Sequence, residues 1–86
     1  PSFKQYREKD GQFYFKLVDS KGQVLLQSLG FASPKEAGQT IAGILSEGAA
    51  GQASFSQRLE PLSPQEWALV DQHLQLLQAS AEISTK

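Results

Sequence analysis

A strict two-residue alternation in residues 13–18 limits the possible folds of this chain more than any other feature. Phe13, Phe15 and Leu17 alternate there with Tyr14, Lys16 and Val18. Aromatic and branched residues at this period are typical of a β-strand. Residues 3–8 and 23–30 are two further candidate strands. We therefore expect an antiparallel sheet at the start of the chain.

The dipeptide Asp10-Gly11 predicts a tight turn between the first two strands. This pair suits a two-residue type I′ hairpin, because both of its positions need positive φ. With that turn, Tyr6 lies opposite Phe15 and Arg7 lies opposite Tyr14. The turn therefore sets which side chains share a face of the sheet.

The predicted register divides the sheet into two faces, with the third strand joined through a loop at residues 19–22. The face expected in the core carries Tyr6, Phe13, Phe15, Leu17, Val24 and Leu26. The other face mixes cationic, aromatic and aliphatic residues: Phe3, Gln5, Arg7, Tyr14, Lys16, Val18, Leu25, Gln27 and Leu29. We look for a function on this mixed face.

Two Ser-Pro-x-Glu sequences, at residues 33–36 and 63–66, predict the starts of two helices. The serine can cap free backbone N–H groups, proline suits the first helical position, and the glutamate can complete a capping box. The first helix should end at Gly48, before a flexible link through residue 51. Residues 53–59 alternate again and predict a fourth strand.

The second helix is expected to run to about residue 80, with a frayed tail at 83–86. Leu62 and Trp67 occupy the two positions of a hydrophobic staple. The main apolar stripe comprises Trp67, Val70, Leu74, Leu77 and Ala81, and Leu69, His73 and Leu76 widen it. This apolar arc is wider than the stripe that a surface helix usually buries.

The expected fold class is α+β: an antiparallel sheet of three to four strands in the order β-β-β-α-β, plus a C-terminal helix. Residues 1–60 would form the β-β-β-α-β unit. Residues 61–86 would form the amphipathic helix and tail of the same domain. A single domain of 86 residues has a thin core, so contact with a partner would help to stabilise it.

Composition excludes several classes of function. The chain has no cysteine and one histidine, which rules out thiolate chemistry and a histidine-rich metal site. A serine nucleophile needs a positioned general base, and His73, the only histidine, has no evident third partner for that role. The Gly48–Gly51 segment lacks the lysine of a phosphate loop. We expect no catalytic residue, no metal and no cofactor in this domain. We interpret His73 as an interfacial or edge residue rather than a ligand or a base.

We expect a cytoplasmic protein without a membrane span, and the absence of cysteine fits a reducing compartment. The net charge is −1, but residues 1–22 hold five basic against three acidic side chains. No apolar run approaches the length of a membrane helix, and we expect no signal peptide because no basic region leads into an apolar stretch. Because the chain begins at Pro1 and contains no methionine, we expect it to be a fragment of a longer protein.

Residues 11–17 (GQFYFKL) and 22–31 (GQVLLQSLGF), followed by Ser33, Ala37, Ile41 and Ile44, resemble the YegP-like domains. This resemblance covers residues 10–45 well, although Thr40 stands where the family has a glycine. It implies the β-β-β-α-β order and a pairing of two copies into one sheet. Since this chain has one copy, the resemblance implies a homodimer.

A narrower resemblance joins residues 3–8 (FKQYRE), 10–17, 24–28 (VLLQS), Phe31 and 33–38 (SPKEAG). These segments resemble the C-terminal extension of long-form bacterial tryptophan–tRNA ligases. The resemblance implies that the parent attaches tryptophan to tRNA with ATP. This chain has neither the HIGH-type nor the KMSKS-type signature, so it would be a non-catalytic accessory domain. Its partner would be the parent's catalytic domain, a second copy or tRNA.

Two interpretations of the mixed face remain open. Arg7, Lys16, Tyr14 and Phe3 would suit single-stranded RNA, through phosphate neutralisation and base stacking. Alternatively, the exposed apolar residues favour packing against a neighbouring domain or a second copy. The candidate residues for that contact are Leu25, Leu29, Leu69 and Leu76. In the second case the chain would be a free-standing homodimeric interaction module without a link to tRNA.

Overall fold

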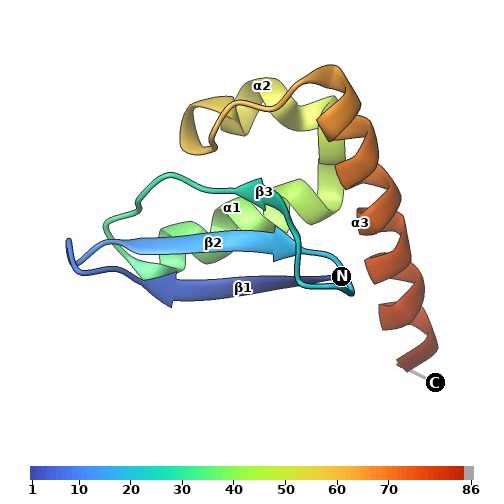
Figure 1. Ribbon diagram of the computed structural model, residues 1–86, viewed down its shortest axis with the longest axis horizontal. Helices are drawn as coiled ribbons and strands as arrows, with labels where there is room; N and C mark the ends of the chain where they lie inside the picture. Colours follow the sequence, from blue (N-terminus) through green and yellow to red (C-terminus); the bar gives the residue numbers. More distant parts are fainter. Residues whose placement is uncertain (85–86) are drawn as a thin grey trace.

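The chain folds into a three-stranded antiparallel sheet with helices on one face and at one end (Figure 1). A computed structural model describes residues 1–84, with side chains described through residue 77. The strands are β1 (Ser2–Arg7), β2 (Phe13–Val18) and β3 (Val24–Gln27). They are followed by α1 (Pro34–Glu47), the short turns η1 (Gly48–Gly51), α2 (Gln52–Phe55) and η2 (Ser56–Arg58), and α3 (Pro64–Ser84).

The sheet has one face covered by α1, here called the inner face, and one facing away from α1, called the outer face. The strand order is β1-β2-β3, and α1 runs behind the sheet in Figure 1. α3 stands at the end of the sheet near the N-terminus. The core lies between the inner face and the helices: Phe15, Leu17, Leu26, Phe31, Ala37, Ile41, Ile44, Phe55, Leu59, Trp67, Val70 and Leu74.

The predicted α+β class and its three antiparallel strands are confirmed, but the predicted pairing of β1 with β2 is wrong by one residue. Tyr6 pairs with Tyr14 and Arg7 pairs with Phe13. A shift of one residue moves every side chain of a strand to the opposite face. The shift therefore places Phe3 on the inner face and Tyr6 on the outer face.

The hairpin turn explains this shift. The backbone N–H of Glu8 donates to Gln12 O (3.1 Å), and the N–H of Gly11 donates to Glu8 O (3.0 Å). Three residues, 9–11, therefore form the loop instead of two. Gly11 has φ 80°, the left-handed position that closes a three-residue hairpin. The Asp-Gly signal correctly located the turn but not its length.

The pairing of β2 with β3 also differs from the prediction. Leu17 pairs with Leu26, and an irregularity follows at Val18, which pairs with Val24. The pairing at Leu26 is shifted by two residues from the predicted one. An even shift keeps a side chain on the same face, so Leu26 stays in the core as predicted. Val24 was expected in the core but is 52% exposed, because the irregularity lies between it and Leu26.

The predicted fourth strand and flexible link are replaced by three short helical turns over residues 48–58. Helical turns bury Phe55 against Trp67, with ring centroids 6.0 Å apart. Of the predicted strand, a single bridge between Leu59 and Ser28 remains. Two backbone hydrogen bonds, Leu29 N–H to Arg58 O and Glu60 N–H to Gln27 O (both 2.9 Å), continue this contact along the edge of β3.

Both predicted helix starts are confirmed. Ser33 Oγ accepts from the N–H of Glu36 (3.3 Å), and Ser63 Oγ accepts from that of Glu66 (3.1 Å). At the second start the box is reciprocal, because the Ser63 N–H also donates to Glu66 Oε1 (2.8 Å). Gly48 ends α1 with φ 57°, as expected.

α3 continues to Ser84, beyond the predicted end near residue 80. Trp67, Val70 and Leu74 are buried, which confirms the first part of the predicted apolar stripe. Ala81 lies outside the residues with described side chains, and the predicted tail lies partly outside the described chain.

Candidate nucleic-acid interface on the outer sheet face

The four residues predicted to contact RNA are divided between the two faces of the sheet. Tyr14 and Lys16 lie on the outer face, as expected. Phe3 and Arg7 pair with Leu17 and Phe13 on the inner face, so the prediction that all four share one surface is wrong. The cause is the three-residue turn.

Phe3 and Arg7 each contact an aromatic ring of the inner face. The Phe3 ring contacts Phe15 edge-on, with centroids 6.0 Å apart. The Arg7 guanidinium carbon lies 5.5 Å from the centroid of Phe13, a cation–π distance. The Phe3 ring is therefore packed against the core, whereas Arg7 is exposed but lies on the opposite face from Tyr14 and Lys16.

On the outer face, equivalent residues of β1 and β2 form rows across the strands. Lys4 pairs with Lys16, and Tyr6 pairs with Tyr14 in the next row. Rows two residues apart on a strand are about 7 Å apart. Beyond the tyrosines, toward the hairpin, come Glu8 and Asp10. The face therefore changes along the strands from cationic to aromatic to acidic.

The tyrosine row is fixed by contacts from all three strands. The Tyr6 and Tyr14 rings stack with centroids 5.7 Å apart and an interplanar angle of 14°. Gln27 Nε2 donates to Tyr6 Oη at 2.7 Å, and Lys16 Nζ lies 5.5 Å from the Tyr6 centroid. The Gln27 amide also contacts the carbonyl oxygens of Phe15 (3.3 Å) and Ser28 (3.1 Å). The aromatic surface is thus pre-organised on the sheet.

A short hydrogen bond holds the outer end of Tyr14. Tyr14 Oη donates to Asp10 Oδ2 at 2.5 Å, and the Gln12 N–H donates to Asp10 Oδ1 at 2.8 Å. The bond to Asp10 raises the pKa of Tyr14 to about 12. The Tyr14 bond and the Gln12 N–H lower the pKa of Asp10. At neutral pH, Tyr14 is therefore protonated and Asp10 is ionised.

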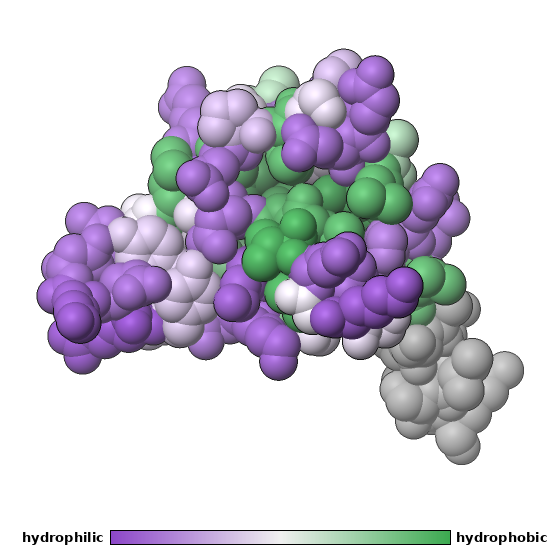
Figure 2. Space-filling view, in the orientation of Figure 1, coloured by the Kyte–Doolittle hydropathy of each residue, from purple (hydrophilic) through white to green (hydrophobic). Residues whose placement is uncertain are grey.

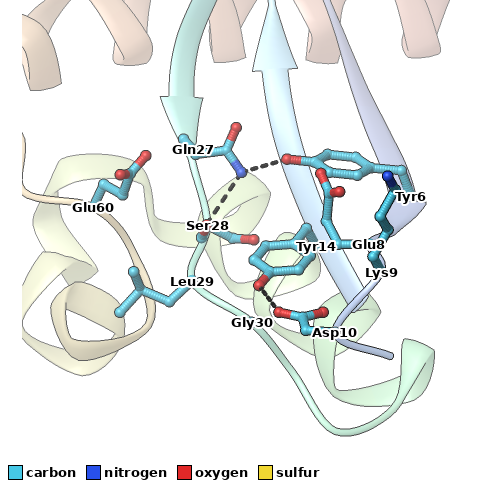
Figure 3. Close-up of a pocket in the computed structure, with 10 residues that line it drawn as sticks. All are labelled: Tyr6, Glu8, Lys9, Asp10, Tyr14, Gln27, Ser28, Leu29, Gly30 and Glu60. Atoms are coloured by element: carbon cyan, nitrogen blue, oxygen red, sulfur yellow. Dashed lines mark hydrogen bonds between the residues drawn. The ribbon is translucent and has the colours of Figure 1, made fainter. Parts of the chain in front are cut away.

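A hollow of about 560 Å³ opens beside the tyrosines, between the hairpin and the segment after β3 (Figure 3). Its lining is aromatic, acidic and partly apolar: Tyr6, Glu8, Lys9, Asp10, Tyr14, Gln27, Ser28, Leu29, Gly30 and Glu60. Glu60 and Leu29 lie across the hollow from Tyr14 (Figure 3). The sequence pattern gave no indication of this hollow, because Glu60 reaches it only through the pairing along the edge of β3.

Of the four predicted oligomer-contact residues, three are exposed and one is partly buried. Leu29 is 44% exposed, Leu69 44% and Leu76 56%. Leu25 is partly buried against the core.

A patch of apolar side chains is visible in the middle of the outer side (Figure 2). Beside β3, a second hollow of about 180 Å³ is lined by Val24, Leu25, Leu26, Gln27, Glu60, Pro61, Leu62 and Glu66.

His73 lies on α3 with its Nδ1 2.9 Å from Leu69 O, so this ring nitrogen carries the proton and donates. Among the described residues, no group of three or more histidine, cysteine or carboxylate side chains could hold a metal ion. In the same part of the chain, no helix has the length and apolarity needed to cross a membrane.

Two residues of the outer face, Tyr6 and Lys4, were not predicted to belong to the site. Sequence reasoning placed Tyr6 in the core because of the assumed turn length. A three-residue reading of Lys9-Asp10-Gly11 would have found both residues, since Gly11 then takes the position that requires positive φ.

The sequence of this chain is similar to one described domain family and to several named bacterial proteins. The family described as a domain of unknown function, DUF1508, matches residues 8–53. A tryptophan–tRNA ligase of Xylella fastidiosa is 54% identical over 63 residues, which are 73% of this chain and 14% of that protein.

Shorter matches reach proteins with the same name in other bacteria. The one from Xanthomonas campestris is 76% identical over 42 residues, which are 49% of this chain and 10% of the relative. The one from Bordetella pertussis is 50% identical over 36 residues, which are 42% of this chain and 8% of the relative.

This chain therefore spans about a seventh of the length of the first relatives it matches. No solved structure matches it significantly. The family match covers more than half of the chain, from the hairpin through α1 and into α2. The chain belongs to the DUF1508, or YegP-like, family.

Proposed function

We propose that this chain is a non-catalytic accessory domain, the C-terminal extension of a tryptophan–tRNA ligase, and that its outer sheet face contacts tRNA. The names of the relatives support the first part. The parent would charge tRNA with tryptophan in the cytoplasm, using ATP bound outside this domain. The domain itself would need no cofactor.

The single observation that supports RNA contact is the pairing of Tyr6 with Tyr14. This register brings a second tyrosine beside Lys16 on the outer face. It also removes Phe3, while Val18 is buried and Leu25 is partly buried. The face therefore keeps two aromatic and two cationic residues, now in adjacent tyrosine and lysine rows, while Val18 and Leu25 are wholly or partly withdrawn from solvent and Val24 is exposed at the edge. The adjacency of the two rows favours nucleic acid over the packing of a neighbouring domain.

The expected mode of contact follows from the order of the rows. Phosphates would lie over Lys4 and Lys16, where the positive charge is. An unpaired base would stack near Tyr6, as bases stack on aromatic residues of other RNA-binding sheets. The carboxylates of Glu8 and Asp10 would repel phosphate at the other end. The RNA backbone would thus be confined to the lysine end.

Charge reversal at one lysine tests this proposal. We expect Lys16→Glu to weaken binding of a tRNA transcript and to reduce the slope of log Kd against log salt by about one, because one phosphate contact is lost. Fluorescence anisotropy at several salt concentrations measures both. Lys35→Glu is the matched control, because Lys35 lies at the start of α1, away from the outer face. Equal effects of the two variants, or none from Lys16→Glu, would overturn the proposal.

A second candidate function is that of a homodimeric interaction module. The exposure of Leu29, Leu69 and Leu76 favours it, as does the position of β1 at the edge of the sheet. Sedimentation equilibrium of the chain at high micromolar concentration tests it. A dimer that Leu69→Glu with Leu76→Glu converts to a monomer would support this function, and a monomer throughout would exclude it.

A further inference from the structure

The hollow beside Tyr14 has an electrostatic character opposite to that of the lysine row. Its charged lining comprises three carboxylates, Glu8, Asp10 and Glu60, against the single ammonium of Lys9. The lysine row and this hollow are separated by the tyrosines. A phosphate would be repelled here, so the hollow is suited to a different ligand from the one that Lys16 would bind.

The walls of the hollow also suit a flat cation with an apolar stem. The Tyr14 ring is neutral and held in place by its bond to Asp10. Leu29, 44% exposed, lies across from it (Figure 3). Cations bind favourably over a tyrosine face, and arginine also lays its methylene groups along apolar surface. Its planar guanidinium can donate two parallel hydrogen bonds to one carboxylate.

We propose that this hollow receives an arginine side chain from a basic segment of a protein partner. The guanidinium would lie against the Tyr14 ring and donate to the Glu60 carboxylate, while the methylene groups would contact Leu29. Charge complementarity identifies the occupant: the lining carries a net charge of two negatives, which one arginine partly neutralises. Lys9 is the internal competitor for the same carboxylates. The domain would thus use two ends of one sheet face for two ligands of opposite charge.

Titration with a minimal ligand, followed by amide chemical shifts of the labelled chain, tests this inference. The probe is N-acetyl-arginine amide, and the matched control is N-acetyl-citrulline amide, which has nearly the same shape without the charge. We expect the arginine probe to shift the amide signals of Tyr14, Leu29, Gly30 and Glu60, and the citrulline probe to leave them unchanged. Glu60→Gln should weaken binding about threefold, the size expected for one exposed charge contact. Lys9→Ala should strengthen it.

Several outcomes would overturn the inference. These are equal shifts with both probes, no shifts with either, or shifts of the same signals by uridine monophosphate but not by the arginine probe. The last result would assign the hollow to RNA. The inference is independent of the proposed function, because Lys16→Glu should leave arginine binding intact while it weakens tRNA binding. Glu60→Gln should do the reverse.

Discussion

The two faces of the sheet come from the same three strands but have opposite properties. On the inner face, Phe15 and Leu17 are completely buried beneath α1. On the outer face, the neighbouring Tyr14 and Lys16 are partly exposed and meet Tyr6 from β1. The inner face is closed by apolar contact, whereas the outer face is ordered by polar atoms such as the Gln27 amide and the Asp10 carboxylate.

This difference separates stability from binding. Removal of a side chain from the inner face leaves a cavity, which costs free energy of unfolding. A side chain on the outer face can be changed at a smaller cost, because water fills its place. Mutations on the outer face can therefore test function without destroying the fold.

The largest expected effect is on the inner face. Phe15→Ala should lower the free energy of unfolding by about 3–4 kcal/mol, the usual cost of truncating a buried aromatic residue. Urea denaturation measures it. Tyr14→Ala, one residue away on the outer face, is the control and should cost less than half as much. If Phe15→Ala does not fold, Phe15→Leu takes its place in the comparison with Tyr14→Ala. Equal losses from Phe15→Ala and Tyr14→Ala would contradict the division of the faces.

A smaller effect is expected at the capped N-termini of α1 and α3. Ser63→Ala should cost about 1 kcal/mol, because it removes the cap on the Glu66 N–H. Ser33→Ala should cost less, since its hydrogen bond is longer at 3.3 Å. Thermal unfolding of the two variants compares them directly. A larger loss from Ser33→Ala would show that α1 depends on its cap more than α3 does.

The smallest expected effect is a change with pH at the outer face. In the Tyr6→Phe variant Tyr14 is the sole tyrosine, and its phenol should titrate near pH 12 by ultraviolet absorbance. Because its pKa is raised, the folded state favours the protonated phenol. This contribution to stability is complete below pH 10 and is lost as the pH rises through about 12. Asp10→Asn should return the pKa toward 10; an unchanged value would show that Asp10 is not the cause.

Much of the fold could be predicted because it depends on local signals. The alternation in residues 13–18 identified β2, and the Ser-Pro-x-Glu sequences located both helix starts. The register of β1 could not be predicted in the same way. It depends on whether Asp10-Gly11 or Lys9-Asp10-Gly11 forms the loop, and both loops are compatible with the sequence.

The candidate site was predicted in part for the same reason. Tyr14 and Lys16 lie in the well-defined strand β2, so their outer position followed from the alternation alone. Tyr6 and Phe3 exchanged faces with the register. Residues 53–59 alternate like a strand but form helical turns, because burial of Phe55 against Trp67 outweighs the weak local preference.

Chemical-shift mapping of the chain with a single-stranded uridine decamer tests most directly whether the outer face is the RNA surface. We predict that the amide signals of Lys4, Tyr6, Tyr14, Lys16 and Gln27 shift together, and that the signals of α1 around Lys35 stay in place. Shifts confined to α1, or no shift at low salt, would contradict the assignment of RNA contact to this face.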